Sequence, residues 1–235
     1  MNAQTVVIIG GSSGMGLATA TLMSQLGYDI IIASRSKEKL DKAILAIGKG
    51  TAYTLDASSE ESVQEFFSSI PTFHHLVISA ADFVSGPFLQ LSIQEARRFF
   101  DSKFWAQYTV AKYGAKKIQK DGSITFFSGI LSQKPGINLS VAASINAAVE
   151  GLTRSLALEL APIRVNAIAP GTIHTPVWDT IPEKNRLAYF EKTSQTLPVR
   201  RIGQPEDIAQ VAQFLIECGY MTGEVIRCDG GALLL

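Results

Sequence analysis

The chain has 235 residues, of which 46% are hydrophobic and 18% charged, which is enough to bury one substantial core. Basic and acidic residues balance at 21 each, so no long-range field favours a polyanion, and binding to nucleic acid is not expected. No charged leader and no apolar run of roughly 18 residues is found, so a cytoplasmic protein without a membrane contact is expected. The two cysteines and three histidines lack metal-ligand spacing, and no metal site is predicted.

Short apolar runs rich in β-branched residues alternate along the chain with amphipathic stretches. Continuous apolar strands with helices between them imply a parallel sheet covered on both faces. We therefore expect a doubly wound α/β fold of the Rossmann type in a single domain, residues 1–235. Residues 172–203 depart from this rhythm and are predicted to form a small helical lid over a pocket. The predicted strands are 5–10, 29–34, 51–56, 74–79, 123–128 and 163–169.

A glycine-rich stretch, IGGSSGMG, follows the first predicted strand. Gly10 permits a tight turn, Gly14 lets the backbone approach a pyrophosphate, and Gly16 lets helix and strand pack closely. The helix that begins here adds amide donors and its dipole. A glycine-rich turn without a ligand is the alternative, but the position at the first turn from strand to helix favours a cofactor. The predicted phosphate loop comprises Gly10, Ser12, Ser13, Gly14, Met15 and Gly16.

The ends of the second and third strands indicate which dinucleotide binds. A carboxylate at the second strand end would select NAD, whereas this chain has Ser34 followed by Arg35. Arginine can bind a 2′-phosphate through two charge-assisted hydrogen bonds, so NADP(H) is the predicted cofactor. The alternative is an arginine that only solvates the loop. Asp56, followed by Ala57, is placed to accept a hydrogen bond from the adenine amino group, or else to cap the next helix.

These motifs resemble the short-chain dehydrogenase/reductase family over essentially the whole chain. IRVNAIAPGTIHT, residues 163–175, is similar to the segment in which that family binds the nicotinamide. The resemblance implies a small-molecule substrate and a homotetramer or homodimer formed through two long helices, about 93–120 and 140–161, and the C-terminal segment. It also implies further cofactor contacts at Ser79, Ala80, Ala81, Pro170, Gly171, Ile173 and Thr175.

The catalytic positions of the family are changed in this chain. Family members reduce carbonyls with an Asn, Ser, Tyr and Lys set, in which a tyrosine gives a proton to oxygen and a lysine lowers its pKa. Ala142 falls at the tyrosine position and Asn146 at the lysine position. Gly129 falls at the serine position, with Ser128 immediately before it, and Lys103 replaces the asparagine.

Lys103 and Asn146 look like an exchange between the two helices. Apolar neighbours at helical spacing surround Lys103, so burial should lower its pKa. Our hypothesis is that Lys103 enters the pocket from the opposite wall and contacts the nicotinamide ribose or relays a proton. The alternative is that its side chain extends to solvent. Lys103, Ser128 and Asn146 are the candidate catalytic residues, and Lys103 is also a candidate cofactor contact.

The predicted function is an NADP(H)-dependent oxidoreductase with an atypical active site. A catalytically silent NADPH sensor or partner subunit is the alternative. Apolar and aromatic residues in and near the lid predict a small apolar or aromatic carbonyl, enal or quinone as substrate, although packing of the lid itself explains part of the pattern. His174, at the nicotinamide end, is expected to face water, and a role as general acid is the alternative. The apolar residues are Phe83, Val84, Val177, Trp178, Ile181, Leu187, Tyr189 and Phe190.

Overall fold

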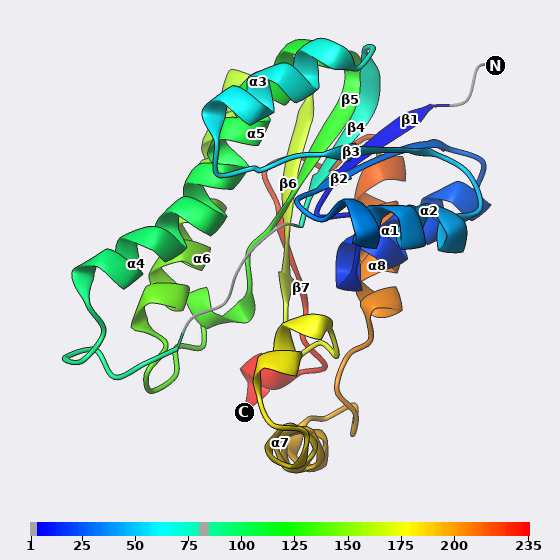
Figure 1. Cartoon of the computed structure of the whole chain (residues 1–235). Helices are drawn as coiled ribbons and strands as arrows, with labels where there is room; N and C mark the ends of the chain where they lie inside the picture. Colours follow the sequence, from blue (N-terminus) through cyan, green and yellow to red (C-terminus); the bar gives the residue numbers. More distant parts are fainter. Residues whose placement is uncertain (1–3, 80–84) are drawn as a thin grey trace.

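A parallel sheet of seven strands forms the centre of the protein, in the order β3-β2-β1-β4-β5-β6-β7 (Figure 1). The computed structural model describes residues 4–79 and 85–235. All six predicted strands are present. The strands are β1 (Thr5–Ile9), β2 (Asp29–Ser34), β3 (Thr51–Thr54), β4 (Phe73–Ile78), β5 (Ile118–Phe127), β6 (Arg164–Pro170) and β7 (Val225–Cys228).

Two elements differ from the sequence prediction. The edge strand β7 was not predicted, because its four residues include Arg227 and Cys228 and give no apolar run. Strand β5 begins at Ile118, before the expected start, although Asp121 and Gly122 are poor strand formers. The sequence predicted that the preceding helix continues to Lys120. The helix ends earlier, because β5 already begins at Ile118.

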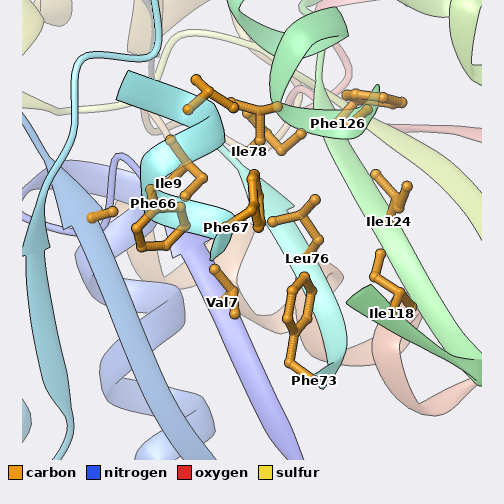
Figure 2. Close-up of a cluster of buried hydrophobic side chains, with 14 of the residues drawn as sticks. Val7, Ile9, Phe66, Phe67, Phe73, Leu76, Ile78, Ile118, Ile124 and Phe126 are labelled. Carbon is orange, nitrogen blue, oxygen red and sulfur yellow. The ribbon is translucent and has the colours of Figure 1, made fainter. Parts of the chain in front are cut away.

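Helices cover both faces of the sheet, as expected for a doubly wound fold (Figure 1). On one side α1, α2 and α8 pack over Val6 and Ile8, and on the other α3, α5 and α6 pack over Val7 and Ile9. Alternate residues of β1 thus enter opposite cores. Figure 2 shows part of the second core, in which Phe73 and its aromatic neighbours fill the space against β4 and β5. The helices are α1 (Gly14–Gln25), α2 (Lys37–Ile47), α3 (Glu60–Ser69), α4 (Ile93–Phe100), α5 (Ala106–Gly114), α6 (Ser140–Glu159), α7 (Glu183–Thr196) and α8 (Pro205–Glu217).

The strand order reverses between β1 and β4, which are neighbours in the sheet. In such sheets a ligand binds beyond the carboxyl ends of the strands at this reversal. The end of β4 is held to the end of β1 by a backbone hydrogen bond from Ser79 to Ile9 (2.9 Å), and the next residue after β1, Gly10, bonds to Ala33 of β2 (2.8 Å). The predicted phosphate loop therefore lies at the position where this fold binds its ligand.

Two irregular segments border the carboxyl end of the sheet. A π-helical turn, Asp101–Trp105, joins α4 to α5 and carries Lys103. The predicted lid consists of a 3₁₀ turn, Pro176–Thr180, and α7, which lies beyond the ends of β6 and β7 in Figure 1. Within the described residues, no helix combines the length and apolarity that a membrane crossing requires.

Candidate active site

The phosphate loop has the geometry of an anion-binding helix start. Helix α1 begins at Gly14 with no acidic residue in its first turn, and its N-cap, Ser13, makes no capping hydrogen bond through its side chain. The backbone of Gly10 and Gly14 is left-handed, with φ of 87° and 51°. A side chain at Gly16 would overlap the carbonyl of Gly10 and the hydroxyl of Ser79. The first amides of α1 are thus available to a phosphate group.

The segment after β6 lies directly against this loop. A Cβ atom on Gly14 would be 3.3 Å from the Cβ of Thr175, although the two residues are far apart in sequence. Pro170 ends β6, the amide of Gly171 bonds to Cys228, and the buried Ile173 pairs with Gly203. The structure therefore brings together the two segments that we expected to hold opposite ends of the cofactor.

The end of β2 offers polar groups to a ligand. The hydroxyl of Ser34 is buried and has no hydrogen-bond partner in residues 4–79 and 85–235, and Arg35 beside it is exposed. A buried hydroxyl without a partner is uncommon in proteins, so this one can gain a bond when a ligand binds. Serine, arginine and the glycine loop together fit a dinucleotide that carries an additional phosphate.

Asp56 has a local structural role in addition to the role we predicted. Its carboxylate accepts a hydrogen bond from the amide of Ser58 (3.0 Å), which closes the turn after β3. The alternative that Asp56 caps α3 is wrong, because the side chain of Ser59 caps that helix. Asp56 remains exposed and Ala57 packs at the edge of the core, so the adenine contact stays a prediction. Two further predicted contacts, Ala80 and Ala81, lie outside the described residues.

Lys103 points into the protein and not into solvent. Its ammonium donates to the side-chain oxygen of Asn146 (2.7 Å) and to the backbone carbonyl of Ser128 (2.9 Å). Because an ammonium can only donate, the contacted atom of Asn146 is its amide oxygen. Burial lowers the pKa of Lys103 to about 8. The alternative of a lysine extended to water is wrong, and the two exchanged residues form one hydrogen-bonded pair.

Gly129 provides the space that Asn146 occupies. A Cβ atom on residue 129 would lie 2.6 Å from Nδ2 of Asn146. The amide nitrogen therefore fills the space next to the backbone where a side chain at residue 129 would begin. Gly129, Asn146 and Lys103, which we predicted at changed catalytic positions, thus lie together, and Asn146 offers an N–H donor beside the Lys103 ammonium.

Ser128 contributes to this unit through its backbone. Its hydroxyl donates to the carboxylate of Glu150 (2.9 Å), while its carbonyl holds Lys103. Ala142, which we predicted at the family's tyrosine position, lies in the first turn of α6, one turn before Asn146, and has no proton to donate from its side chain. Lys103 is a candidate acid that is hydrogen-bonded directly to Asn146 (2.7 Å).

Two polar residues of the site escaped the sequence analysis, Gln107 and Glu150. Gln107 is fully buried and binds both backbone groups of Phe127, each at 3.1 Å. Each residue follows a candidate catalytic residue by four positions, Lys103 and Asn146 respectively. A polar residue one helical turn beyond a candidate, on an apolar face, is a signal that could have found both.

The lid aromatics divide into a packed group and an exposed group. Trp178 bonds to the carbonyl of Ile173 (2.8 Å) and Phe190 is buried, so these two fasten the lid. His174 is exposed with its ring edge on Phe190, as expected for a residue facing water. The remaining described members are exposed, namely Val177, Ile181, Leu187 and Tyr189, whereas Phe83 and Val84 lie outside the described residues. Among the described residues, no cluster of His, Cys, Asp or Glu has the arrangement of a metal site.

A parallel sheet with a glycine loop at its reversal point defines a Rossmann-type nucleotide-binding protein. A family model described as enoyl-(acyl carrier protein) reductase matches residues 10–232. The chain is 32% identical to the short-chain dehydrogenase/reductase ATR9 of Stachybotrys chlorohalonatus, over 98% of this chain and 97% of ATR9. The chain therefore belongs to the short-chain dehydrogenase/reductase family, as the motifs indicated.

Solved structures agree with this assignment. A small-chain dehydrogenase in complex with NADPH superimposes with a TM-score of 0.87, at 38% identity over 100% of both chains. The MalC reductase/Diels-Alderase from Malbranchea aurantiaca superimposes with a TM-score of 0.92, at 29% identity over 99% of this chain and 97% of MalC. The predicted single-domain doubly wound fold is confirmed by these likenesses.

Proposed function

We propose that this protein is an NADP(H)-dependent oxidoreductase in which Lys103 supplies the proton. The observation that carries the proposal is the 2.7 Å hydrogen bond between Lys103 and Asn146 beside Gly129. It joins a buried ammonium to an oriented amide at the positions that we predicted to be catalytic. The named relatives, a dehydrogenase/reductase and a reductase/Diels-Alderase, support a redox reaction.

The residues present fit an NADPH cofactor. The open amides of α1 and the space at Gly14 suit the pyrophosphate, and the unsatisfied hydroxyl of Ser34 with Arg35 suits the 2′-phosphate. Thr175, in contact distance of the loop, would hold the nicotinamide end. The likeness to a dehydrogenase that binds NADPH supports the same choice. When bound, NADPH supplies a hydride to the substrate.

The chain contributes the proton and the stabilisation of charge. As hydride reaches a substrate carbon, negative charge develops on the conjugated oxygen, and the Asn146 amide donates a hydrogen bond to it. Lys103 transfers one proton from its ammonium to the reduced substrate and is left as a neutral amine, which water reprotonates. Its pKa of about 8 keeps it largely protonated at neutral pH while making it a far better acid than a free lysine.

This arrangement favours substrates that develop negative charge on oxygen. An ammonium and an amide N–H stabilise an enolate or phenolate and oppose a cationic iminium substrate. Ala142 has a much smaller side chain than the tyrosine of the family, and exposed Val177, Ile181 and Leu187 on the lid suit an apolar body. An apolar or aromatic ketone, enal or quinone is therefore the proposed substrate class.

A screen of the purified protein tests this function. NADPH consumption is followed by absorbance with panels of ketones, enals, quinones and iminium ions. We expect turnover with at least one of the first three panels, and a loss of about 10² to 10⁴ in rate for Lys103→Met. Lys120→Met, at an exposed position on β5, is the matched control and should keep the wild-type rate.

The same screen distinguishes the proposed oxidoreductase from the alternative, a catalytically silent NADPH sensor. Ala142, which carries no proton donor where the family has tyrosine, is the observation that favours a silent NADPH sensor. Tight NADPH binding with no turnover in any panel would support the sensor. Turnover that Lys103→Met leaves unchanged would retain an oxidoreductase but reject Lys103 as its acid.

A further inference from the structure

Glu150 is a buried carboxylate that the proposed chemistry does not use. It lies on α6 one turn after Asn146, and only 7% of its surface is exposed. No lysine, arginine or histidine among the residues that the structure describes lies within ion-pair distance of it. Burying a carboxylate without a cation is costly unless hydrogen bonds compensate it.

Both partners of Glu150 come from the turn that contains Gly129. One carboxylate oxygen, Oε1, accepts the hydroxyl of Ser128 (2.9 Å) and also the hydroxyl of Ser132, at short range. The Ser132 hydroxyl further reaches the carbonyl of Gly129 (3.2 Å), and that of Ser128 reaches the carbonyl of Asn146 (3.4 Å). A single oxygen thus ties together the two ends of a five-residue turn.

The turn held by Glu150 also sets the position of Lys103. The hydroxyl of Ser128 binds Glu150 while the carbonyl of the same residue accepts the Lys103 ammonium (2.9 Å). On the opposite side, Gln107 from α5 holds the backbone of Phe127, the last residue of β5. Two helices therefore clamp the end of β5, and Glu150 is the anchor on the side of α6.

We propose that Glu150 is a positioning residue that fixes the Ser128–Ser132 turn and, through the Ser128 carbonyl, the direction of the Lys103 ammonium. The inference rests on the proposed role of Lys103 for its catalytic meaning. The part of the inference that concerns the position of the Lys103 ammonium can be tested without measuring turnover. The anchoring requires an acceptor oxygen at position 150 and does not require a negative charge, since both partners are neutral hydroxyls.

Chemical labelling of Lys103 tests this inference in the full-length protein. The acetylation rate of Lys103 by acetic anhydride is measured by peptide mass spectrometry, relative to Lys120 in the same digest. In Glu150→Leu and Ser132→Ala the ammonium loses an ordered acceptor, and we expect labelling to rise about fivefold, as for the loss of one hydrogen bond. Glu150→Gln keeps the acceptor oxygen and should label at the wild-type rate.

Glu159→Leu is the matched control, because Glu159 is exposed on the same helix and its carboxylate accepts a local bond from Ser155. It should not change the labelling of Lys103. Wild-type labelling in both Glu150→Leu and Ser132→Ala would overturn the proposal, as would a rate in Glu150→Gln equal to that in Glu150→Leu. If Glu150→Leu does not fold, Ser132→Ala alone decides. Failure of the proposed function would instead appear as absent turnover in the wild-type protein.

Discussion

Gly129 and Asn146 are sterically matched, because a Cβ atom on residue 129 would lie 2.6 Å from the amide nitrogen of Asn146. The backbone at Gly129 is extended, so glycine is not required there for its conformation. Glycine is required at this position because the absence of a side chain leaves room for the Asn146 amide. A side chain at residue 129 and the Asn146 amide therefore exclude one another in the present arrangement.

Gly129→Ser tests this exclusion. The serine should displace the Asn146 amide and break its bond to Lys103, which lowers the free energy of unfolding by about 1–3 kcal/mol. Asn146→Ala alone should also destabilise, and the double variant should recover most of the loss. Denaturant unfolding of the four proteins gives the coupling energy. Additive effects would contradict the matched pair.

The pH dependence of turnover should report Lys103. Burial lowers its pKa from 10.5 to about 8, so the ammonium is present near neutral pH and is lost as the pH rises through about 8. With a substrate found by the screen, kcat should therefore fall on the alkaline side with an apparent pKa near that value. In Lys103→Met the rate should be lower and should lack this limb. A rate that stays constant until the pH approaches 10 would argue against Lys103 as the acid.

Arg35→Ala should change the choice of cofactor. Losing a charge-assisted bond to the 2′-phosphate costs about 1.5–3 kcal/mol, so the Kd for NADPH should rise about tenfold or more. The Kd for NADH, which lacks that phosphate, should change little. Fluorescence titration with both nucleotides measures this, with Lys39→Ala on the exposed side of α2 as control. An equal loss for both nucleotides would contradict a specific phosphate contact.

His75 should make the fold sensitive to acid. Its ring bonds to Ser123 (2.9 Å) and Gln4 (3.2 Å), and burial, with Arg164 and His74 nearby, lowers its pKa from 6.5 to about 4 despite Asp121. The neutral ring therefore stabilises the fold above pH 6.5, and this contribution is lost as the pH falls toward 4. The loss amounts to roughly 3 kcal/mol at most.

Urea unfolding of the wild type and of His75→Gln over this pH range measures the effect. The variant should start less stable and should lose less stability on acidification. His174→Gln, at an exposed histidine, serves as control and should follow the wild type. Parallel curves for all three proteins would show that another group controls the acid transition.

We propose that the protein is a homodimer or homotetramer. Trp105 and Tyr108 pack edge to face on the exposed side of the helices before β5, and Leu158 is exposed on neighbouring α6. Large apolar groups that are exposed favour burial against another surface. Light scattering should give a multiple of the 25.3 kDa chain mass, and Trp105→Glu or Leu158→Glu should reduce it. Leu45→Glu, on the other face, should not, and a wild-type monomer would refute the proposal.

Periodicity in the sequence was sufficient to predict the layers of the fold. Runs such as TVVII and DIIIAS are apolar throughout because strands of a parallel sheet are buried on both faces. The short strand β7 was not predicted, because its sequence, Val-Ile-Arg-Cys, is not an apolar run. Its pairing depends on β6, which lies about 60 residues earlier in the chain.

The candidate site was only partly predictable. An apolar helix face around Lys103 indicated that the lysine turns inward, and the exchange with Asn146 suggested that the two changes are linked, but the direct bond between them was not predicted. The exclusion between Gly129 and Asn146 depends on distances of a few ångströms between separate elements, which spacing does not encode. The bond from two serines to Glu150 is likewise a tertiary contact, so that acidic residue could not be assigned a partner from its neighbours.

The π-helical turn Asp101–Trp105 affects how Lys103 is oriented relative to Gln107, further along the same helix. A bond that closes over five residues holds one residue more than a regular α-helical turn. Deleting one residue between Lys103 and Gln107 would restore a regular helix and rotate Lys103 by about 100° about the helix axis relative to Gln107. The ammonium would then lose its bonds to Asn146 and Ser128 although Lys103, Ser128 and Asn146 were all retained, so the site depends on the length of this helical turn as well as on the identity of its residues.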